Sequence, residues 1–253
     1  MKILISPISL VEAQIVVTGG CDILDIKNVK EGSLGAQPPW VIQEIVQAFK
    51  HQGLICSATL GDLPQKPGTA GLAAYGAALC GVDYVKAGLH DSKCYQDALD
   101  MMNTIVKAVR SVSDSILVVA SGYADFRRFG GASYQDVVAA ARDSNSNVVM
   151  LDTAIKDGMT LLDNMNFDEI QEFVDTAHEA GLLVALAGSI KEADIEALAH
   201  IGPDIVGVRG AVCDSGNRKQ GITLERVTAF MNYAREIAPD DQESPPALAA
   251  AME

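Results

Sequence analysis

Three lysines of the 253-residue sequence stand where an amine could do covalent chemistry. Lys27 and Lys86 each end a short apolar run, in the similar contexts CDILDIK and GVDYVK, and Lys156 follows a third such run. A lysine that loses its proton forms a Schiff base with a carbonyl compound, and burial or a second cation nearby lowers its pKa toward this state. Three lysines gathered at one place would perturb one another, so they predict carbonyl chemistry through an imine.

Two aspartates belong to the same pattern. Strand alternation places Asp25 and Lys27 on one face and leaves Leu24 and Ile26 for the other, and the same argument turns Asp152 inward. Such carboxylates oppose the loss of charge from a lysine, but they can shuttle protons during imine formation. The alternative interpretation is that these charges are structural salt bridges. For five charged residues at strand ends we favour catalysis, because burying charge is costly.

The residues that must position this chemistry form a repeating pattern of short apolar runs separated by helical sequence. Near-continuous hydrophobicity is typical of parallel strands buried on both faces. The eight predicted strands are residues 3–8, 23–27, 54–59, 84–89, 116–123, 148–154, 183–190 and 205–211. Eight regular units, without a GxGxxG after the first strand, favour a closed TIM (β/α)₈ barrel over an open doubly wound sheet. We predict one α/β domain over residues 1–238 and a disordered, acidic, Pro-rich tail over 239–253.

The loops after strands seven and eight of such a barrel are common phosphate sites. Here they contain Gly188 and Ser189, and then Gly207, Arg209 and Gly210, so we predict that these five bind phosphate through backbone amides and a guanidinium. Either glycine motif alone would fit a tight turn equally well. The long loop over residues 27–35 either folds over a substrate or is a plain surface loop.

Composition excludes several other functions. Nineteen Lys and Arg against 33 Asp and Glu give a net charge of −14, which disfavours nucleic acid but allows a small phosphorylated substrate in a basic cleft. The four histidines are isolated, so we predict no metal site and no cofactor, and only His90 falls near the barrel mouth. Five scattered cysteines, and no export signal or membrane span, predict a cytoplasmic protein.

Several long, ordered blocks carry a family resemblance from about residue 3 to the last helix. These blocks are DIKNVKEGSLGA, SATLGDLPQKPGT, YVKAGL, MLDTAIKDG, ALAGSI and DIVGVRGA. The sequence resembles the (5-formylfuran-3-yl)methyl phosphate synthases of methanofuran biosynthesis. The resemblance implies that two glyceraldehyde 3-phosphate molecules condense into a furan aldehyde with loss of one phosphate and two waters. It also implies that Lys27 is the Schiff-base residue, that Lys86 is the proton acceptor, and that Asp25, Asp152 and Lys156 are further active-site residues.

Two rival functions remain open at this level. One is an ordinary lysine aldolase that acts on triose phosphates and stops at the carbon–carbon bond. The other is a non-catalytic sugar-phosphate sensor built on the same barrel. A triose phosphate is the expected partner if the protein is an enzyme, and a homo-oligomer is compatible with the sequence.

Overall fold

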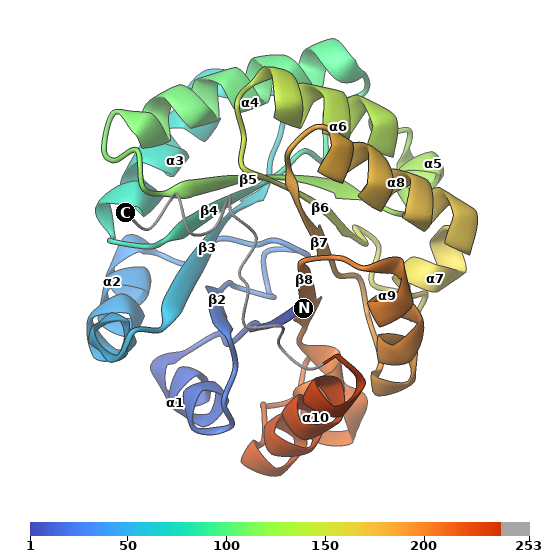
Figure 1. Cartoon of the computed structure of the whole chain (residues 1–253). Helices are drawn as coiled ribbons and strands as arrows, with labels where there is room; N and C mark the ends of the chain where they lie inside the picture. The colour runs from blue at the N-terminus through green and yellow to red at the C-terminus, as the bar shows by residue number, and fades with distance from the viewer. Residues whose placement is uncertain (239–253) are drawn as a thin grey trace.

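The computed structural model describes residues 1–238, which form a closed parallel barrel. Each strand pairs with the next, and β8 pairs with β1 to close the ring, as Figure 1 shows. The strands are β1 (Lys2–Ile5), β2 (Ile23–Ile26), β3 (Ile55–Asp62), β4 (Tyr84–Gly88), β5 (Leu117–Tyr123), β6 (Val148–Asp152), β7 (Leu183–Leu186) and β8 (Ile205–Val208). The predicted (β/α)₈ barrel is confirmed. The predicted tail, residues 239–253, lies outside the described residues.

Helices surround the barrel and cover its outer face (Figure 1). They are α1 (Leu10–Thr18), α2 (Pro39–Phe49), α3 (Pro67–Leu79), α4 (Tyr95–Arg110), α5 (Phe126–Phe129), α6 (Tyr134–Asp143), α7 (Leu161–Asn164), α8 (Phe167–Glu179), α9 (Ile195–Ile201) and α10 (Leu224–Ile237). In α4, Met101, Ile105 and Val109 recur every four residues and are fully buried, so one face of the helix packs on the strands. None of the helices in residues 1–238 is long and apolar enough to cross a membrane.

Several strands end earlier than the apolar runs predicted. The run 205–211 is a strand only over Ile205–Val208, because the chain then turns into the short 3₁₀ helix η3 (Gly210–Val212). The run 183–190 is a strand only over Leu183–Leu186, since Gly188 and Ser189 both have positive φ. Lys27 likewise lies one residue beyond β2. Lys27, Ser189 and Arg209 therefore lie at the barrel mouth, just beyond the ends of their strands.

The interior of the barrel changes character along its axis. Its amino-terminal half is filled by a separate apolar cluster that includes Leu4, Ile23, Val148 and Leu183. A larger apolar core lies between the strands and the helices. At the carboxyl-terminal half, inward positions of the same strands carry charged side chains, with Asp25 two residues after Ile23 on β2. The packed lower half thus forms the floor on which a polar site is built.

Candidate active site

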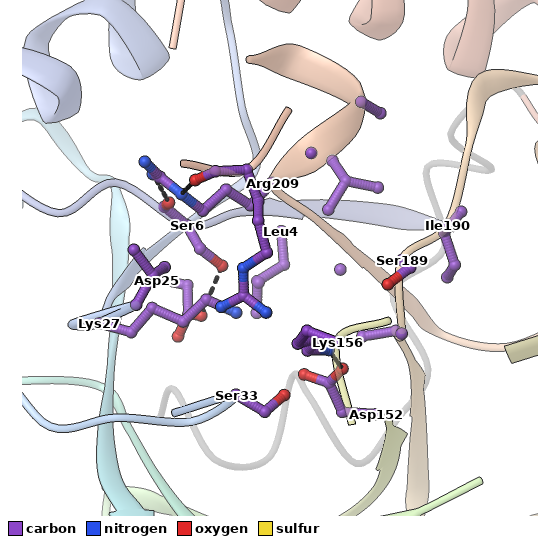
Figure 2. Close-up of a pocket in the computed structure, with 18 of the residues that line it drawn as sticks. Leu4, Ser6, Asp25, Lys27, Ser33, Asp152, Lys156, Ser189, Ile190 and Arg209 are labelled. Carbon is purple, nitrogen blue, oxygen red and sulfur yellow. Dashed lines mark hydrogen bonds and ion pairs between the residues drawn. The ribbon is translucent and has the colours of Figure 1, made fainter. Parts of the chain in front are cut away.

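All ten residues predicted for catalysis or phosphate binding line one cavity of about 910 Å³ at the carboxyl ends of the strands. Nine of the chain's 19 lysines and arginines line it, against three of its 33 aspartates and glutamates. The cavity is therefore strongly basic within an acidic protein, and its field favours an anionic ligand. Figure 2 shows Asp25 and Lys27 on one side of this cavity, with Asp152 and Lys156 on another.

Lys86 and Asp25 form a buried ion pair at the bottom of the cavity. Lys86 Nζ lies 2.7 Å from Asp25 Oδ1, and both side chains are at most 2% exposed. The Ser6 hydroxyl donates to the other carboxylate oxygen, Oδ2, at 2.8 Å. Apart from Asp25, the Lys86 ammonium has no hydrogen-bond partner within residues 1–238. The pair can exchange a proton, and one face of the amine remains available to a ligand.

Lys27 differs from its neighbours because its amine has no carboxylate of its own. No hydrogen bond or ion pair joins Lys27 Nζ to any residue in the described part of the chain, although the side chain is almost fully buried. Burial lowers the pKa of Lys27 from 10.5 to about 8; Asp152 and Asp25 oppose this, and Lys86 and Lys156 add to it. At that pKa about one amine in ten is neutral at pH 7, roughly 300 times the ordinary fraction. Lys27 is therefore the lysine best prepared to act as a nucleophile.

Asp152 at the end of β6 is held by the third lysine. Lys156 Nζ donates to Asp152 Oδ1 at 2.7 Å and to Thr153 Oγ1 at 2.9 Å. Burial raises the pKa of Asp152, but the charges of Lys156 and Lys27, together with hydrogen bonds from Lys156 and the Thr153 amide, outweigh burial and hold it below its usual range. Asp152 is therefore an ionised hydrogen-bond acceptor beside the cavity.

The two predicted phosphate loops offer free backbone amides. No described residue accepts a hydrogen bond from the amide of Gly188, Ser189 or Gly210. Gly188 has φ +111, and a Cβ there would lie 3.0 Å from Thr153 Cγ2 and 3.1 Å from the Thr153 nitrogen, so only glycine brings this loop against the end of β6. Gly207 lies inside β8 and lines the cavity, and a Cβ there would lie 3.2 Å from Ala187 Cβ, so this glycine permits close packing and does not supply a loop amide.

The expectation that the Arg209 side chain binds phosphate requires correction. Its five N–H groups are all engaged: they donate to both carboxylate oxygens of Glu12 and to the carbonyls of Ser6, Arg218 and Gln220. The Glu12 carboxylate, on helix α1, forms a buried ion pair with Arg209 at 2.7 Å. Arg209 therefore fixes the loop after β8 and holds Gly210 in position.

The loop after β2 lies over the cavity, as one of its two predicted interpretations requires. Asp62 at the end of β3 accepts from the Ser33 amide at 2.7 Å and the Leu34 amide at 3.3 Å, and also from the Tyr123 hydroxyl. Gly32 has φ +132, and a Cβ there would fall 2.0 Å from Asp62 Oδ2. Asp62 thus clamps the segment that follows Lys27.

Sequence reasoning missed several cationic cavity residues, among them Arg218, and gave too much weight to His90. Arg218, in the loop after β8, lines the cavity, and inspecting that whole loop for cations would have found it. His90, the histidine expected near the mouth, does not line the cavity and stacks its ring on Phe129 at 4.7 Å. Across residues 1–238, no group of three or more His, Cys, Asp or Glu side chains is placed to hold a metal ion.

The segment that contains the site residues matches a known protein family. Residues 3–231 match the sequence model of the 4-HFC-P synthase family. The chain belongs to this family. The (5-formylfuran-3-yl)methyl phosphate synthase of Methanococcus maripaludis strain C5 is 50% identical over 237 residues, which cover 93% of this chain and 100% of that protein. The Methanocaldococcus jannaschii protein of the same name is 51% identical over 87% of this chain and 94% of its own.

The barrel of this 4-HFC-P synthase family member also resembles solved structures at much lower identity. KGPDC from Streptococcus mutans aligns with a TM-score of 0.63 and 11% identity over 94% of this chain and 98% of its own. A likeness at this identity concerns the fold alone. The synthase relatives, together with the assembled lysine site, indicate that this family member is an enzyme.

Proposed function

We propose that the protein condenses two molecules of glyceraldehyde 3-phosphate, through a Schiff base on Lys27, into (5-formylfuran-3-yl)methyl phosphate. One phosphate and two waters leave, which balances the two trioses against the product. The observation that carries the proposal is the Lys27 amine, which is buried, free of any carboxylate partner among residues 1–238 and lowered in pKa to about 8 inside a basic cavity. The relatives named as synthases of this furan phosphate support the choice of product.

The first step forms a covalent bond to Lys27. Its neutral amine attacks the carbonyl carbon of one triose phosphate, and loss of water gives a protonated imine. Free amides of Gly188, Ser189 and Gly210 hold a phosphate oxygen at the mouth, which orients the triose over the lysine. Lys156 and Asp152, joined at 2.7 Å, lie beside the reacting carbons and can pass the proton to the departing hydroxyl.

The second step joins the two trioses. Lys86 gives its proton to Asp25 across their 2.7 Å contact and then takes an α-proton from the imine, leaving an enamine. The electron pair of the enamine expels the phosphate from the next carbon, which leaves a three-carbon enol bound to Lys27 as its imine. The terminal carbon of this enol forms the new carbon–carbon bond at the keto carbon of the second triose phosphate after that triose has isomerised to its ketose, and the protonated Asp25 returns its proton through Lys86 to the new alkoxide. The new hydroxyl leaves as water, ring closure releases another water, and hydrolysis of the imine takes up one water and frees the aromatic furan from Lys27.

Trapping and spectroscopy test this proposal. Borohydride added during turnover should reduce the imine, and peptide mass analysis should find the triose adduct on Lys27. Pure glyceraldehyde 3-phosphate should yield near-ultraviolet absorption from the conjugated furan aldehyde. Lys27→Arg, which keeps the charge but cannot form the imine, should lose at least about a thousandfold in turnover.

Each rival predicts a different outcome of the same experiment. An aldolase would give the Lys27 adduct and a six-carbon sugar phosphate but no furan absorption. A sensor would bind the triose phosphate without any product. An adduct on Lys86 or Lys156 would overturn the assignment of Lys27.

A further inference from the structure

Ser33 presents a buried hydroxyl that has no partner. The residue is 1% exposed, and its Oγ makes no hydrogen bond within residues 1–238. It lines the cavity, and Figure 2 shows its hydroxyl directed into it. Its backbone is fixed, because the Ser33 amide donates to Asp62 at 2.7 Å. A buried hydroxyl is costly to leave unpaired, so a donor held this firmly toward an open cavity indicates a ligand atom.

Arg218 brings a cation to the same wall of the cavity. One of its guanidinium nitrogens donates to the carbonyl of Gly32, the residue before Ser33, at 3.3 Å. No other N–H of this guanidinium has a partner in the described part of the chain. Arg218 lines the cavity. Burial lowers the pKa of its guanidinium, and the carboxylates of Asp152 and Asp62 act in the opposite direction. Arg218 thus keeps N–H groups available for a ligand, whereas all five N–H groups of Arg209 already donate to protein oxygens.

This wall is separate from the glycine loop after β7, whereas Arg218 itself belongs to the loop after β8, where a Cβ on Gly210 would lie 4.0 Å from Arg218 Cβ. In Figure 2, Ser33 lies on the side of Lys27, whereas Ser189 and Ile190 lie across the cavity, with Asp152 and Lys156 between them. A planar guanidinium with free N–H groups beside a hydroxyl donor is suited to the oxygens of a phosphate monoester. The cavity therefore offers phosphate donors on two walls.

We propose that Ser33 and Arg218 form a second phosphate subsite, so that two phosphorylated trioses are held at once, one phosphate on each wall. This rests on the proposed function, whose reaction joins two such molecules. Holding both phosphates fixes the two carbon skeletons relative to Lys27 and turns the bond-forming encounter into a step within one complex. It also selects a phosphorylated second triose over its phosphate-free analogue.

Equilibrium dialysis with radiolabelled glycerol 3-phosphate tests the subsite without any chemistry, because this probe lacks a carbonyl group. The wild-type protein should bind two equivalents per chain. Arg218→Gln and Ser33→Ala should each weaken one of them by about 10-fold to 100-fold and leave the other unchanged, as expected for loss of a hydrogen bond to a charged group. Lys107→Gln, which removes a charge from the exposed face of α4, is the matched control and should retain both.

Competition between acceptors tests the role in the reaction. With glyceraldehyde 3-phosphate and unphosphorylated glyceraldehyde mixed, the wild type should strongly favour the doubly phosphorylated condensation. In the Arg218→Gln variant this preference should fall by about 10-fold to 100-fold. The Arg218→Lys variant, which keeps the positive charge, should partly restore wild-type activity.

The outcomes separate this proposal from the proposed function. A single equivalent of probe on the wild type, or two undiminished equivalents on both variants, would overturn the subsite. A wild type that binds two equivalents yet gives no Lys27 adduct and no furan would refute the reaction and leave the subsite standing.

Discussion

The two halves of the barrel interior are built from the same strands but have opposite chemistry. The lower half is an apolar cluster in which Ile23, Val148 and Leu183 are at most 6% exposed. The upper half holds Asp25 and Lys86 at similar burial, yet as charges. Two residues along β2 separate Ile23 from Asp25, which is the repeat of a strand. The lower layer thus contributes to stability alone, whereas substitutions in the upper layer should change both stability and turnover.

Within the upper half, the three lysines are not equivalent. Asp25 is committed to Lys86 at 2.7 Å, and Asp152 is committed to Lys156 at the same distance. Two carboxylates serve three ammonium groups, so Lys27 is the lysine left without a partner among the described residues. Removing a paired lysine leaves a buried carboxylate without its cation, whereas removing Lys27 leaves every carboxylate of the site with its lysine partner.

The largest effect should follow from breaking the buried pair. Lys86→Met leaves the Asp25 carboxylate unpaired in the barrel, and such a loss lowers the free energy of unfolding by about 3 to 5 kcal/mol. Turnover should also fall, by about 10² to 10⁴, because the proton acceptor is gone. Urea denaturation and furan formation measure the two effects.

The double variant Lys86→Met/Asp25→Leu is the control for this prediction, because it makes the upper layer resemble the lower one. It should recover most of the lost stability, since well-packed apolar residues often replace a buried ion pair without loss, while remaining inactive. A double variant no more stable than Lys86→Met alone would contradict the view that the stranded charge causes the damage.

The sequence predicts the lower layer and the identity of the charged residues well, since both follow from strand alternation and from apolar runs. It does not predict which lysine stays unpaired, because Asp25 precedes Lys27 by two residues yet pairs with Lys86 from another strand. Pairing depends on strand register and side-chain reach, which a single sequence leaves open. Arg209 fails for a related reason: its partner Glu12 is 197 residues away in the chain.

A substitution in the lower layer should affect stability alone. Leu183→Ala on β7 removes buried methyl groups from the apolar cluster, and the cavity should lower the free energy of unfolding by about 2 to 5 kcal/mol. Turnover per folded molecule should stay within about threefold, because the catalytic residues sit in the layer above. A large loss of turnover in fully folded protein would show that the layers are coupled.

Lys27→Met should change the free energy of unfolding by about 3 kcal/mol in the opposite direction, toward greater stability. The pKa of Lys27 falls from 10.5 to about 8 on folding, and about 1.36 kcal/mol per pKa unit is the free energy by which the folded state disfavours its charge. Below pH 8 this penalty is fully present, so the variant should be more stable than the wild type at pH 7.

The same shift predicts how that gain depends on pH. Between about pH 8 and 10.5 the unfolded chain holds a proton that the folded protein has released, so the wild type gains stability as pH rises and the advantage of Lys27→Met shrinks. Urea denaturation of both proteins from pH 7 to 10 measures the difference. Lys107→Met, which removes an exposed lysine from α4, is the matched control. If the difference in free energy of unfolding between Lys27→Met and the wild type stays constant over this range, Lys27 keeps an ordinary pKa. The lack of a carboxylate partner would then not make Lys27 more reactive than the paired lysines.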